Sequence, residues 1–306
     1  MTADAAHRVF ATTSERGLRQ DLPPMRLWHK AKKLGIWNPQ DIDFTQDIED
    51  WQTLTDMQRE ALLQQGALFL AGEESVTLDL LPLLMTVARE GRIEEEMYLT
   101  SFLFEEAKHV EGFRRFFDVV AQEHSDLSRY HGPSYTRIFY DELPDAMNRL
   151  LTDSSPVAQV RASVTYNLIV EGVLAETGYY GYQRTLTGNH LMPGMQRLVG
   201  LIKRDESRHL AFAVYFLSRL MAEHGDVAWE ALEARMNELL PLALGVVTES
   251  YENDEGDELP FDVPREESMQ YAVLQFQKRL ERLQRARGQT LDEVNRVANE
   301  LDEAEA

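Results

Sequence analysis

Two Glu-x-x-His steps lie about a hundred residues apart in this chain of 306 residues: Glu106 with His109, and Glu206 with His209. Three residues along an α-helix turn roughly 300°, so the carboxylate and the imidazole of each step share one side of a helix. Carboxylates and imidazoles are both common metal ligands in proteins. Two such helices that face each other could hold two metal ions.

The position of each step on its helix matters more than the spacing, because a chain this rich in Glu contains Glu-x-x-His by chance. Each step continues an apolar stripe with the helical period. An isolated charge buried in such a stripe costs many kcal/mol, so the carboxylate must be paired, protonated or metal-bound. The alternative is a partly exposed Glu and His at the edge of each stripe. The apolar neighbours include Leu99, Phe102, Phe113 and Phe116 for the first step, and Leu198, Ile202, Ala213 and Phe216 for the second.

A site for two metals also needs one carboxylate from the helix that precedes each step. Glu73 lies on an apolar stripe about thirty residues before Glu106. Glu74 is its competitor and points some 100° away. Glu171 lies at the centre of another apolar stripe, about thirty-five residues before Glu206. Both missing carboxylates are therefore available at similar spacings.

Four carboxylates offset the charge of two divalent ions, and two imidazoles supply one nitrogen to each ion, a ligand set that favours iron or manganese. Glu106 or Glu206 could bridge the two ions. Asp205 could accept the outer N–H of a ligand histidine, although it could also be an ordinary solvated aspartate. The predicted ligand sets are Glu73, Glu106 and His109 for one metal, and Glu171, Glu206 and His209 for the other.

Helical periodicity with start and stop signals predicts the elements that position these residues. Thr55 caps a long helix that Gly91 closes, and Ser155 followed by Pro156 opens a later one. No alternating strand pattern competes. The predicted helices cover residues 24–34, 55–90, 92–122, 134–151, 155–187, 193–222, 227–251, 264–286 and 290–306.

The order of these helices is that of a ferritin-like bundle, in which two antiparallel pairs of long helices face each other. We predict an all-α fold with the metal site in the core of the bundle and additional helices around it. We expect a single ferritin-like domain over residues 1–306. Its predicted parts are a metal-binding core at about 55–222, an irregular N-terminal segment 1–50, an acidic loop 252–258 and a polar C-terminal helix 290–306.

Composition excludes several classes of function. The chain has no cysteine, so disulfides, iron–sulfur clusters and thiolate-bound zinc are excluded. A net charge of −21 argues against nucleic acid and anionic membrane surfaces. No leader segment and no apolar stretch long enough to span a bilayer is evident. We therefore expect a soluble, cytoplasmic protein with no nucleic-acid partner and no membrane span.

Over roughly residues 55–220 the chain resembles the ribonucleotide reductase small-subunit superfamily, whose signature looks like Asp205-Glu206-x-x-His209. A radical-forming small subunit typically has tyrosine one turn after the first ligand histidine, where this chain has Phe113. The chain is more similar to the ligand-binding oxidases that look like these small subunits. Residues 71–77 (AGEESVT) and 166–172 (YNLIVEG) carry that similarity.

The resemblance implies a cofactor of one manganese and one iron, with two irons as the alternative, and it selects Glu73 over Glu74. It implies that reaction with O2 joins the phenol oxygen of Tyr166 to the β-carbon of Val76 as an ether. It also implies a long-chain fatty acid beside the metals and a homodimer. The function expected is a two-electron oxidation by O2 in an apolar pocket.

Two other functions stay open on the sequence. A radical-generating subunit of a ribonucleotide reductase would need a tyrosine near the metals and a docking tail, and Phe113 and the plain C-terminus speak against it. An iron store would be expected to have shorter four-helix subunits than this chain. The natural substrate, the product and the metal in each position do not follow from the sequence.

Overall fold

The computed structural model describes residues 10–251, 260, 261 and 263–304, with side chains up to residue 300. Within these residues the chain forms helices and no strand, which confirms the all-α prediction. The α-helices are α1 (Pro23–Leu34), α2 (Thr45–Thr53), α3 (Asp56–Arg89), α4 (Ile93–Arg115), α5 (Pro133–Thr136), α6 (Leu143–Arg149), α7 (Pro156–Ser163), α8 (Glu176–Tyr182), α9 (Pro193–His224), α10 (Asp226–Glu249), α11 (Arg265–Ala286) and α12 (Leu291–Ala304). Shorter 3-10 turns lie at Ala11–Thr13, Pro39–Asp41 and Leu127–Tyr130.

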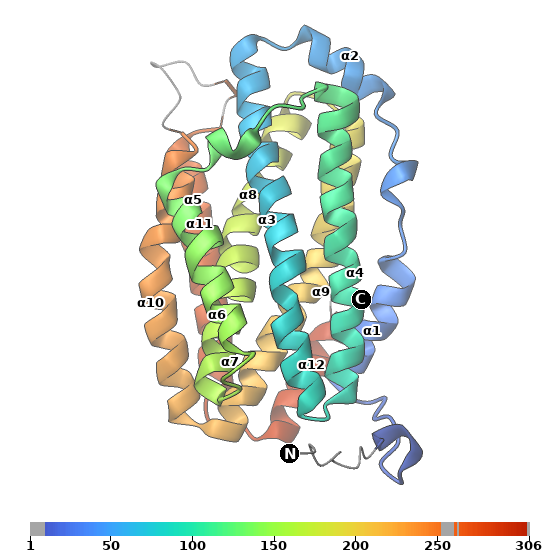
Figure 1. Ribbon diagram of the computed structural model, residues 1–306, viewed down its shortest axis with the longest axis vertical. Helices are drawn as coiled ribbons and strands as arrows, with labels where there is room; N and C mark the ends of the chain where they lie inside the picture. Colours follow the sequence, from blue (N-terminus) through green and yellow to red (C-terminus); the bar gives the residue numbers. More distant parts are fainter. Residues whose placement is uncertain (1–9, 252–259, 262, 305–306) are drawn as a thin grey trace, which may run out of the picture.

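Four long helical rods form the centre of the molecule: α3, α4, α9 and the rod that runs over residues 156–187 (Figure 1). Helix α3 packs along α4, and α9 packs against both α4 and the 156–187 rod. Helices α10 and α11 cover the 156–187 rod, while α1 and α12 pack against α9. This is the ferritin-like arrangement that the sequence predicts, with the additional helices outside.

Local sequence signals set the ends of these helices. Thr55 and Gln58 form a reciprocal capping box at the start of α3, and the Ser155 side chain caps α7. Gly91 lies in the turn between α3 and α4 at φ +73°, a backbone conformation that residues with a side chain rarely adopt. The predicted boundaries at Gly91 and at Ser155 therefore agree with the structure.

The N-terminal segment, predicted as 1–50 and described from residue 10, is less irregular over residues 10–50 than predicted, because α2 begins at Thr45. This nine-residue helix contains only two large apolar residues, too few to show a helical stripe. Tertiary contacts stabilise it instead. Trp51 packs edge-on against Phe116, and the buried carboxylate of Asp47 accepts hydrogen bonds from the backbone N–H groups at the start of α9.

The single predicted helix over 155–187 is also wrong in detail, because wide π-helical turns interrupt it. Similar turns continue α4 and divide the predicted helix over 134–151. In Val164–Ala175 nearly every residue is buried, so the periodicity of apolar residues does not reveal the π-helical turns there. The π-helical segments are Phe116–Ala121, Arg137–Glu142, Val164–Ala175 and Gln183–Thr187.

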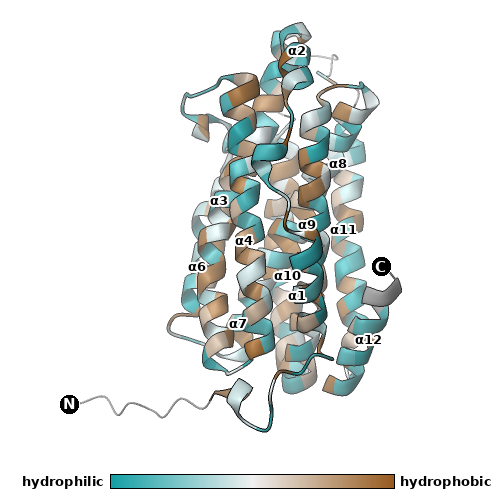
Figure 2. Ribbon diagram, turned by 90° about the vertical axis from the view of Figure 1, so that its right-hand side faces the viewer, coloured by the Kyte–Doolittle hydropathy of each residue, from teal (hydrophilic) through white to brown (hydrophobic). Residues whose placement is uncertain are grey.

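The core consists of two apolar clusters, and the predicted ligands on α3, α4 and α9 lie between them. On α4, for example, Phe102 belongs to one cluster and Phe113 to the other. Among the described helices none is long and apolar enough to cross a membrane, and Figure 2 shows hydrophilic residues recurring along the long helices. The predicted acidic loop 252–258 lies outside the described residues.

Candidate metal centre

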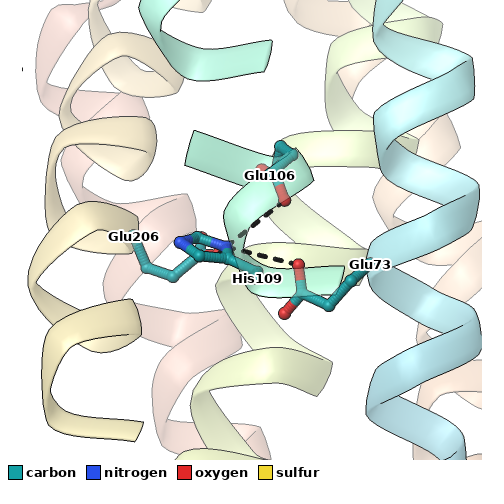
Figure 3. A group of neighbouring side chains, drawn as sticks. All are labelled: Glu73, Glu106, His109 and Glu206. Atoms are coloured by element: carbon teal, nitrogen blue, oxygen red, sulfur yellow. Dashed lines mark ion pairs between the residues drawn. The ribbon is translucent and has the colours of Figure 1, made fainter. Parts of the chain in front are cut away.

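The structure brings all six predicted ligands together in the centre of the bundle. Figure 3 shows Glu73 of α3 and Glu206 of α9 reaching towards His109 of α4. All six residues are at least 95% buried. Their donor atoms form two groups, each with all atoms within 4.8 Å of one another: Glu73, Glu106, His109 and Glu206; and Glu106, Glu171, Glu206 and His209.

Glu106 and Glu206 belong to both groups, which is the arrangement of two neighbouring cation positions with shared carboxylates. The Nδ1 atom of His109 lies 3.4 Å from Glu73 and 3.4 Å from Glu206. The Nδ1 atom of His209 lies 3.2 Å from Glu106 and 3.3 Å from Glu206. Nδ1 is therefore the ring nitrogen that faces the carboxylates of the cluster in both histidines.

Several polar atoms of this cluster have no hydrogen-bond partner although they are buried. They include both carboxylate oxygens of Glu106, Oε1 of Glu171 and Nδ1 of His109. Buried polar atoms normally have hydrogen-bond partners. Several unpaired oxygen and nitrogen atoms that point to one place are therefore the arrangement expected of a cation-binding site. These buried Glu and His groups suit a dinuclear metal site with oxygen and nitrogen ligands.

Burial and close contact shift the pKa values of the groups in the cluster. Burial raises the pKa of Glu73 to about 8 and raises the pKa of Glu171 well above its usual range. Burial acts in the same direction on Glu106, but the adjacent imidazolium groups of His109 and His209 hold the pKa of Glu106 well below the usual value. The neighbouring carboxylates outweigh burial at the two histidines and raise the pKa of each well above the usual value.

Glu74, the competitor of Glu73, is exposed and points away from the cluster. Asp205 is fully buried, and its Oδ2 atom lies 3.5 Å from Nε2 of His109, so it faces the histidine of the other helix. The same oxygen accepts a hydrogen bond of 2.7 Å from the indole N–H of Trp37. Asp205 is therefore not a solvated aspartate.

Val76 and Tyr166 lie against each other beside the cluster. The hydroxyl of Tyr166 donates a hydrogen bond of 3.2 Å to the backbone carbonyl of Val76, and both residues are buried. Five residues along an α-helix turn about 500°, which would leave Tyr166 some 140° away from Glu171. Both lie in the π-helical segment Val164–Ala175, whose i to i+5 bonds place residues five apart roughly one turn apart. The π-helix thus explains how Tyr166 reaches the site.

Tyr179 is a site residue that sequence reasoning missed. Its hydroxyl lies 3.4 Å from Glu73 and 3.4 Å from Glu206, and its ring stacks on Phe69 at 4.9 Å between centroids. Tyr179 is buried and eight residues after Glu171, across a change from π- to α-helix. A spacing of eight residues lies within the broad apolar face of a helix, but it does not distinguish Tyr179 from a tyrosine that only packs in the core.

A cavity of about 650 Å³ opens from the cluster along α3. Four carboxylates of the cluster line its inner end, whereas His109 and His209 do not line it. The α3 residues on its wall extend from Val76 to Asp56. Among the described residues that line the cavity none is Lys, Arg or His. The other wall residues are mostly apolar or small, among them Leu68, Phe69, Phe139, Val170, Leu174 and Gly178.

Comparison with known proteins places this architecture in a family. The sequence model for the small chain of ribonucleotide reductase matches residues 23–286. An R2-like ligand-binding oxidase with an aerobically reconstituted Mn/Fe cofactor is 38% identical, over 90% of this chain and 98% of that chain, with a TM-score of 0.86. A tyrosine-to-phenylalanine variant of an R2-like ligand-binding oxidase matches over the same shares at 38% identity and a TM-score of 0.84. The resemblance seen in the sequence is confirmed, and the chain belongs to the ribonucleotide reductase small-chain family.

Proposed function

We propose that this chain is an O2-dependent oxidase that holds one manganese and one iron and oxidises a long-chain, fatty-acid-like ligand by two electrons. The observation that carries the proposal is a pair of buried Glu/His groups that share Glu106 and Glu206 and open into an apolar cavity. The similarity to ligand-binding oxidases with a Mn/Fe cofactor supports the choice of metals. Two irons are the alternative loading.

In this proposal Glu73, Glu106 and His109 hold one metal, and Glu171, Glu206 and His209 hold the other. When bound, the metal pair supplies the redox chemistry that couples reduction of O2 to oxidation of the ligand. Four carboxylates balance the charge of two divalent ions, and the imidazoles present Nδ1 to them. Asn167 donates a hydrogen bond of 3.0 Å to Glu171 and so fixes the orientation of that carboxylate.

The length and charge of the cavity support a long-chain monocarboxylate as ligand. Asp56 and Glu73 are seventeen residues apart on α3, a span of about 25 Å. An extended alkyl chain advances roughly 1.25 Å per methylene for a C–C bond near 1.5 Å, so about twenty methylenes would fit that length. With no Lys, Arg or His among the described wall residues, a ligand carboxylate would find its positive partner at the metals.

We further propose that O2 drives formation of an ether between Tyr166 and Val76. The phenol loses its O–H hydrogen and Cβ of Val76 loses its hydrogen, a bond forms between oxygen and carbon, and O2 accepts the two electrons and two protons. The hydrogen bond of 3.2 Å to the Val76 carbonyl holds the phenol oxygen beside that residue. The Cβ–H of valine is tertiary, which makes it a favourable position for hydrogen abstraction.

Anaerobic reconstitution with Mn²⁺ and Fe²⁺, followed by air, tests both parts. We expect about one manganese and one iron per chain, and an intact mass lower by two hydrogens with the loss located in a Val76–Tyr166 cross-linked peptide. Tyr166→Phe should abolish the mass change and retain both metals. Fewer than two metals per chain would refute the metal site, and two metals with no mass change would refute the ether alone.

The rival reading, a radical-generating reductase subunit, meets an obstacle at Phe113. This residue is fully buried and packs against Phe69 at 5.0 Å between ring centroids, so no phenol occupies that position. Binding of this chain to a reductase large subunit in a pull-down would revive the rival.

We also propose a homodimer that buries the exposed stripe Leu78, Leu81 and Met85 on α3. Analytical ultracentrifugation should show a dimer that Leu78→Glu weakens, and a monomeric wild type would contradict this.

A further inference from the structure

One buried arginine contacts two of the π-helical segments. Arg235 lies on α10 and is only 4% exposed. Its side chain reaches Thr165, at the start of the segment Val164–Ala175, and Glu142, at the end of the segment Arg137–Glu142. A buried guanidinium requires partners for its N–H groups, and Arg235 finds them on both segments. It therefore connects two irregular parts of the chain through α10.

The contact with Thr165 fixes the direction of the threonine hydroxyl. Nε of Arg235 donates a hydrogen bond of 2.9 Å to Oγ1 of Thr165. Because Nε can only donate, the hydroxyl accepts in this bond, and its own hydrogen is left for another group. That hydrogen goes to the backbone carbonyl of Arg161, at 2.7 Å. Thr165 is fully buried, so both bonds are made away from solvent.

The carbonyl of Arg161 lies where the winding of the rod changes from α to π. Helix α7 ends at Ser163, and the backbone N–H of Val164 is shared between the carbonyls of Arg161 and Val160. A threonine hydroxyl that bonds the carbonyl four residues earlier slightly destabilises a regular α-helix and often bends it. The hydroxyl of Thr165 therefore favours the change of winding at this point.

The winding in turn sets the position of the next residue, Tyr166. Its hydroxyl donates the hydrogen bond of 3.2 Å to the backbone carbonyl of Val76, and its ring meets Phe102 edge-on at 6.0 Å between centroids. A regular α-helix would direct the phenol elsewhere, some 140° away from Glu171. An altered winding at Thr165 would thus move the phenol away from Val76.

Acidic side chains hold the guanidinium of Arg235 in place. Its Nη1 donates bonds of 2.7 Å to Glu142 and 3.1 Å to Glu238. Arg137 binds the same Glu142 at 2.7 Å, and Arg161 binds the same Glu238 at 2.9 Å. These five side chains of alternating charge form one chain across three elements of the fold. The guanidinium cannot turn away from the rod without breaking its two ion pairs.

We propose that Arg235 is a positioning residue that acts through Thr165: it fixes the start of the π-helical segment and so holds the phenol of Tyr166 at Val76. The inference rests on the proposed ether, in which the phenol O–H and the Cβ–H of Val76 lose their hydrogens and O2 accepts two electrons and two protons. The hydrogen bonds of Arg235 within the described residues reach neither the reacting atoms nor the predicted ligands. Its loss should therefore slow ether formation and leave metal content unchanged.

Thr165→Val tests this role, because valine keeps the shape of threonine and removes the hydroxyl. Protein loaded anaerobically with Mn²⁺ and Fe²⁺ is exposed to air, and the loss of two hydrogens is followed over time by intact mass. We expect Thr165→Val to bind the same two metals and to form the ether about 10- to 100-fold more slowly, since a displacement of roughly 1 Å can cost that much. Thr165→Ser keeps the hydroxyl and should react at nearly the wild-type rate. A wild-type rate in Thr165→Val would overturn the proposal.

Two comparisons separate positioning from a loss of stability. Thr86→Val removes a similar bond, from a buried hydroxyl on α3 to the carbonyl of Pro82 at 2.9 Å, and should form the ether at the wild-type rate. Arg235→Met should slow the ether as Thr165→Val does, and adding Thr165→Val to it should slow the ether no further, because both changes remove one interaction. A further tenfold loss in the double variant would overturn the proposal. If one single variant does not fold, the rate in the other decides.

A crystal structure of metal-free Thr165→Val separates this proposal from the ether itself. If wild type forms no ether, the proposed function fails in that part, and the position of the phenol then decides the role of Arg235. The hydroxyl of Tyr166 should lie beyond hydrogen-bond distance of the Val76 carbonyl in Thr165→Val and within it in Thr86→Val. A phenol that has not moved in Thr165→Val would overturn the proposal, whether or not wild type forms the ether.

Discussion

Glu73→Gln should make the metal-free protein less sensitive to alkaline pH. Burial raises the pKa of Glu73 to about 8 in the folded, metal-free chain, from an ordinary value of 4.5. A raised pKa means that the folded state binds this proton more tightly than the unfolded state does. The stability it contributes is complete below pH 4.5 and is lost as the pH rises to 8. Glutamine carries no such proton, so the variant escapes the loss.

The size of the effect follows from the shift. Each pKa unit is worth 1.36 kcal/mol, so 3.5 units correspond to about 5 kcal/mol, of which about 3 kcal/mol falls between pH 5.5 and pH 9. Urea unfolding of EDTA-treated protein, followed by the fluorescence of its four tryptophans, measures the difference between variant and wild type. From pH 5.5 to pH 9, the difference in the free energy of unfolding between variant and wild type should change by about 3 kcal/mol in favour of the variant. A difference that stays constant with pH would refute the reasoning. Metal binding should remove the pH effect in wild type, because the ion replaces the proton.

Three further predictions follow from individual contacts. Asp79→Asn should raise the free energy of unfolding by about 2 kcal/mol more at pH 7.5 than at pH 4, because burial raises the pKa of Asp79 to about 6 and Ser75 is a weak partner at 3.3 Å; equal effects at the two pH values would contradict this. Gly72→Leu should fill the cavity beside the cluster and reduce binding of a fluorescent fatty acid at least tenfold, whereas Gly200→Leu, on the open face of α9, should not; equal binding by both variants would argue against the cavity as the ligand site. Thr55→Ala should lower the free energy of unfolding by about 1 kcal/mol through loss of the α3 capping box while metal content stays constant, and an unchanged urea midpoint would count against the cap.

The bundle and the ligand cluster could be predicted from the sequence because both depend on periodicity. Glu106 and His109 share one helical face by spacing alone, and the apolar stripe around them indicates which face is buried. Periodicity only weakly separated Glu73 from Glu74, since both neighbours border the same stripe. The structure separates them by exposure, with Glu73 buried and Glu74 exposed.

The rest depends on contacts between segments that are far apart in the sequence. An α-helix would leave Tyr166 some 140° away from Glu171, and the π-helical turns that bring it to the site are found only in the structure. Tyr179 and Glu105 face residues of other helices, and no spacing within their own helix indicates that. Helix α2 has too few apolar residues to show a stripe, and the capping of α9 by its Asp47 joins residues almost 150 positions apart.

The two sides of the metal cluster have different chemistry, and this difference assigns them different roles. The carboxylates Glu73, Glu106, Glu171 and Glu206 line the cavity, whereas His109 and His209 turn Nε2 to the buried acids Asp205 and Glu105, respectively. Carboxylates can change their coordination when a ligand or O2 binds. The described walls of the cavity contain no Lys, Arg or His, so a ligand in the cavity would meet these four carboxylates at its inner end. The imidazoles, whose Nε2 atoms contact these two buried acids, have no such freedom. This division respects the pseudo-symmetry of the two helix pairs, because it separates α3 and the 156–187 rod from α4 and α9. In the proposed function, α3 and the 156–187 rod form the side that admits the ligand, and α4 and α9 supply the histidines on the opposite side.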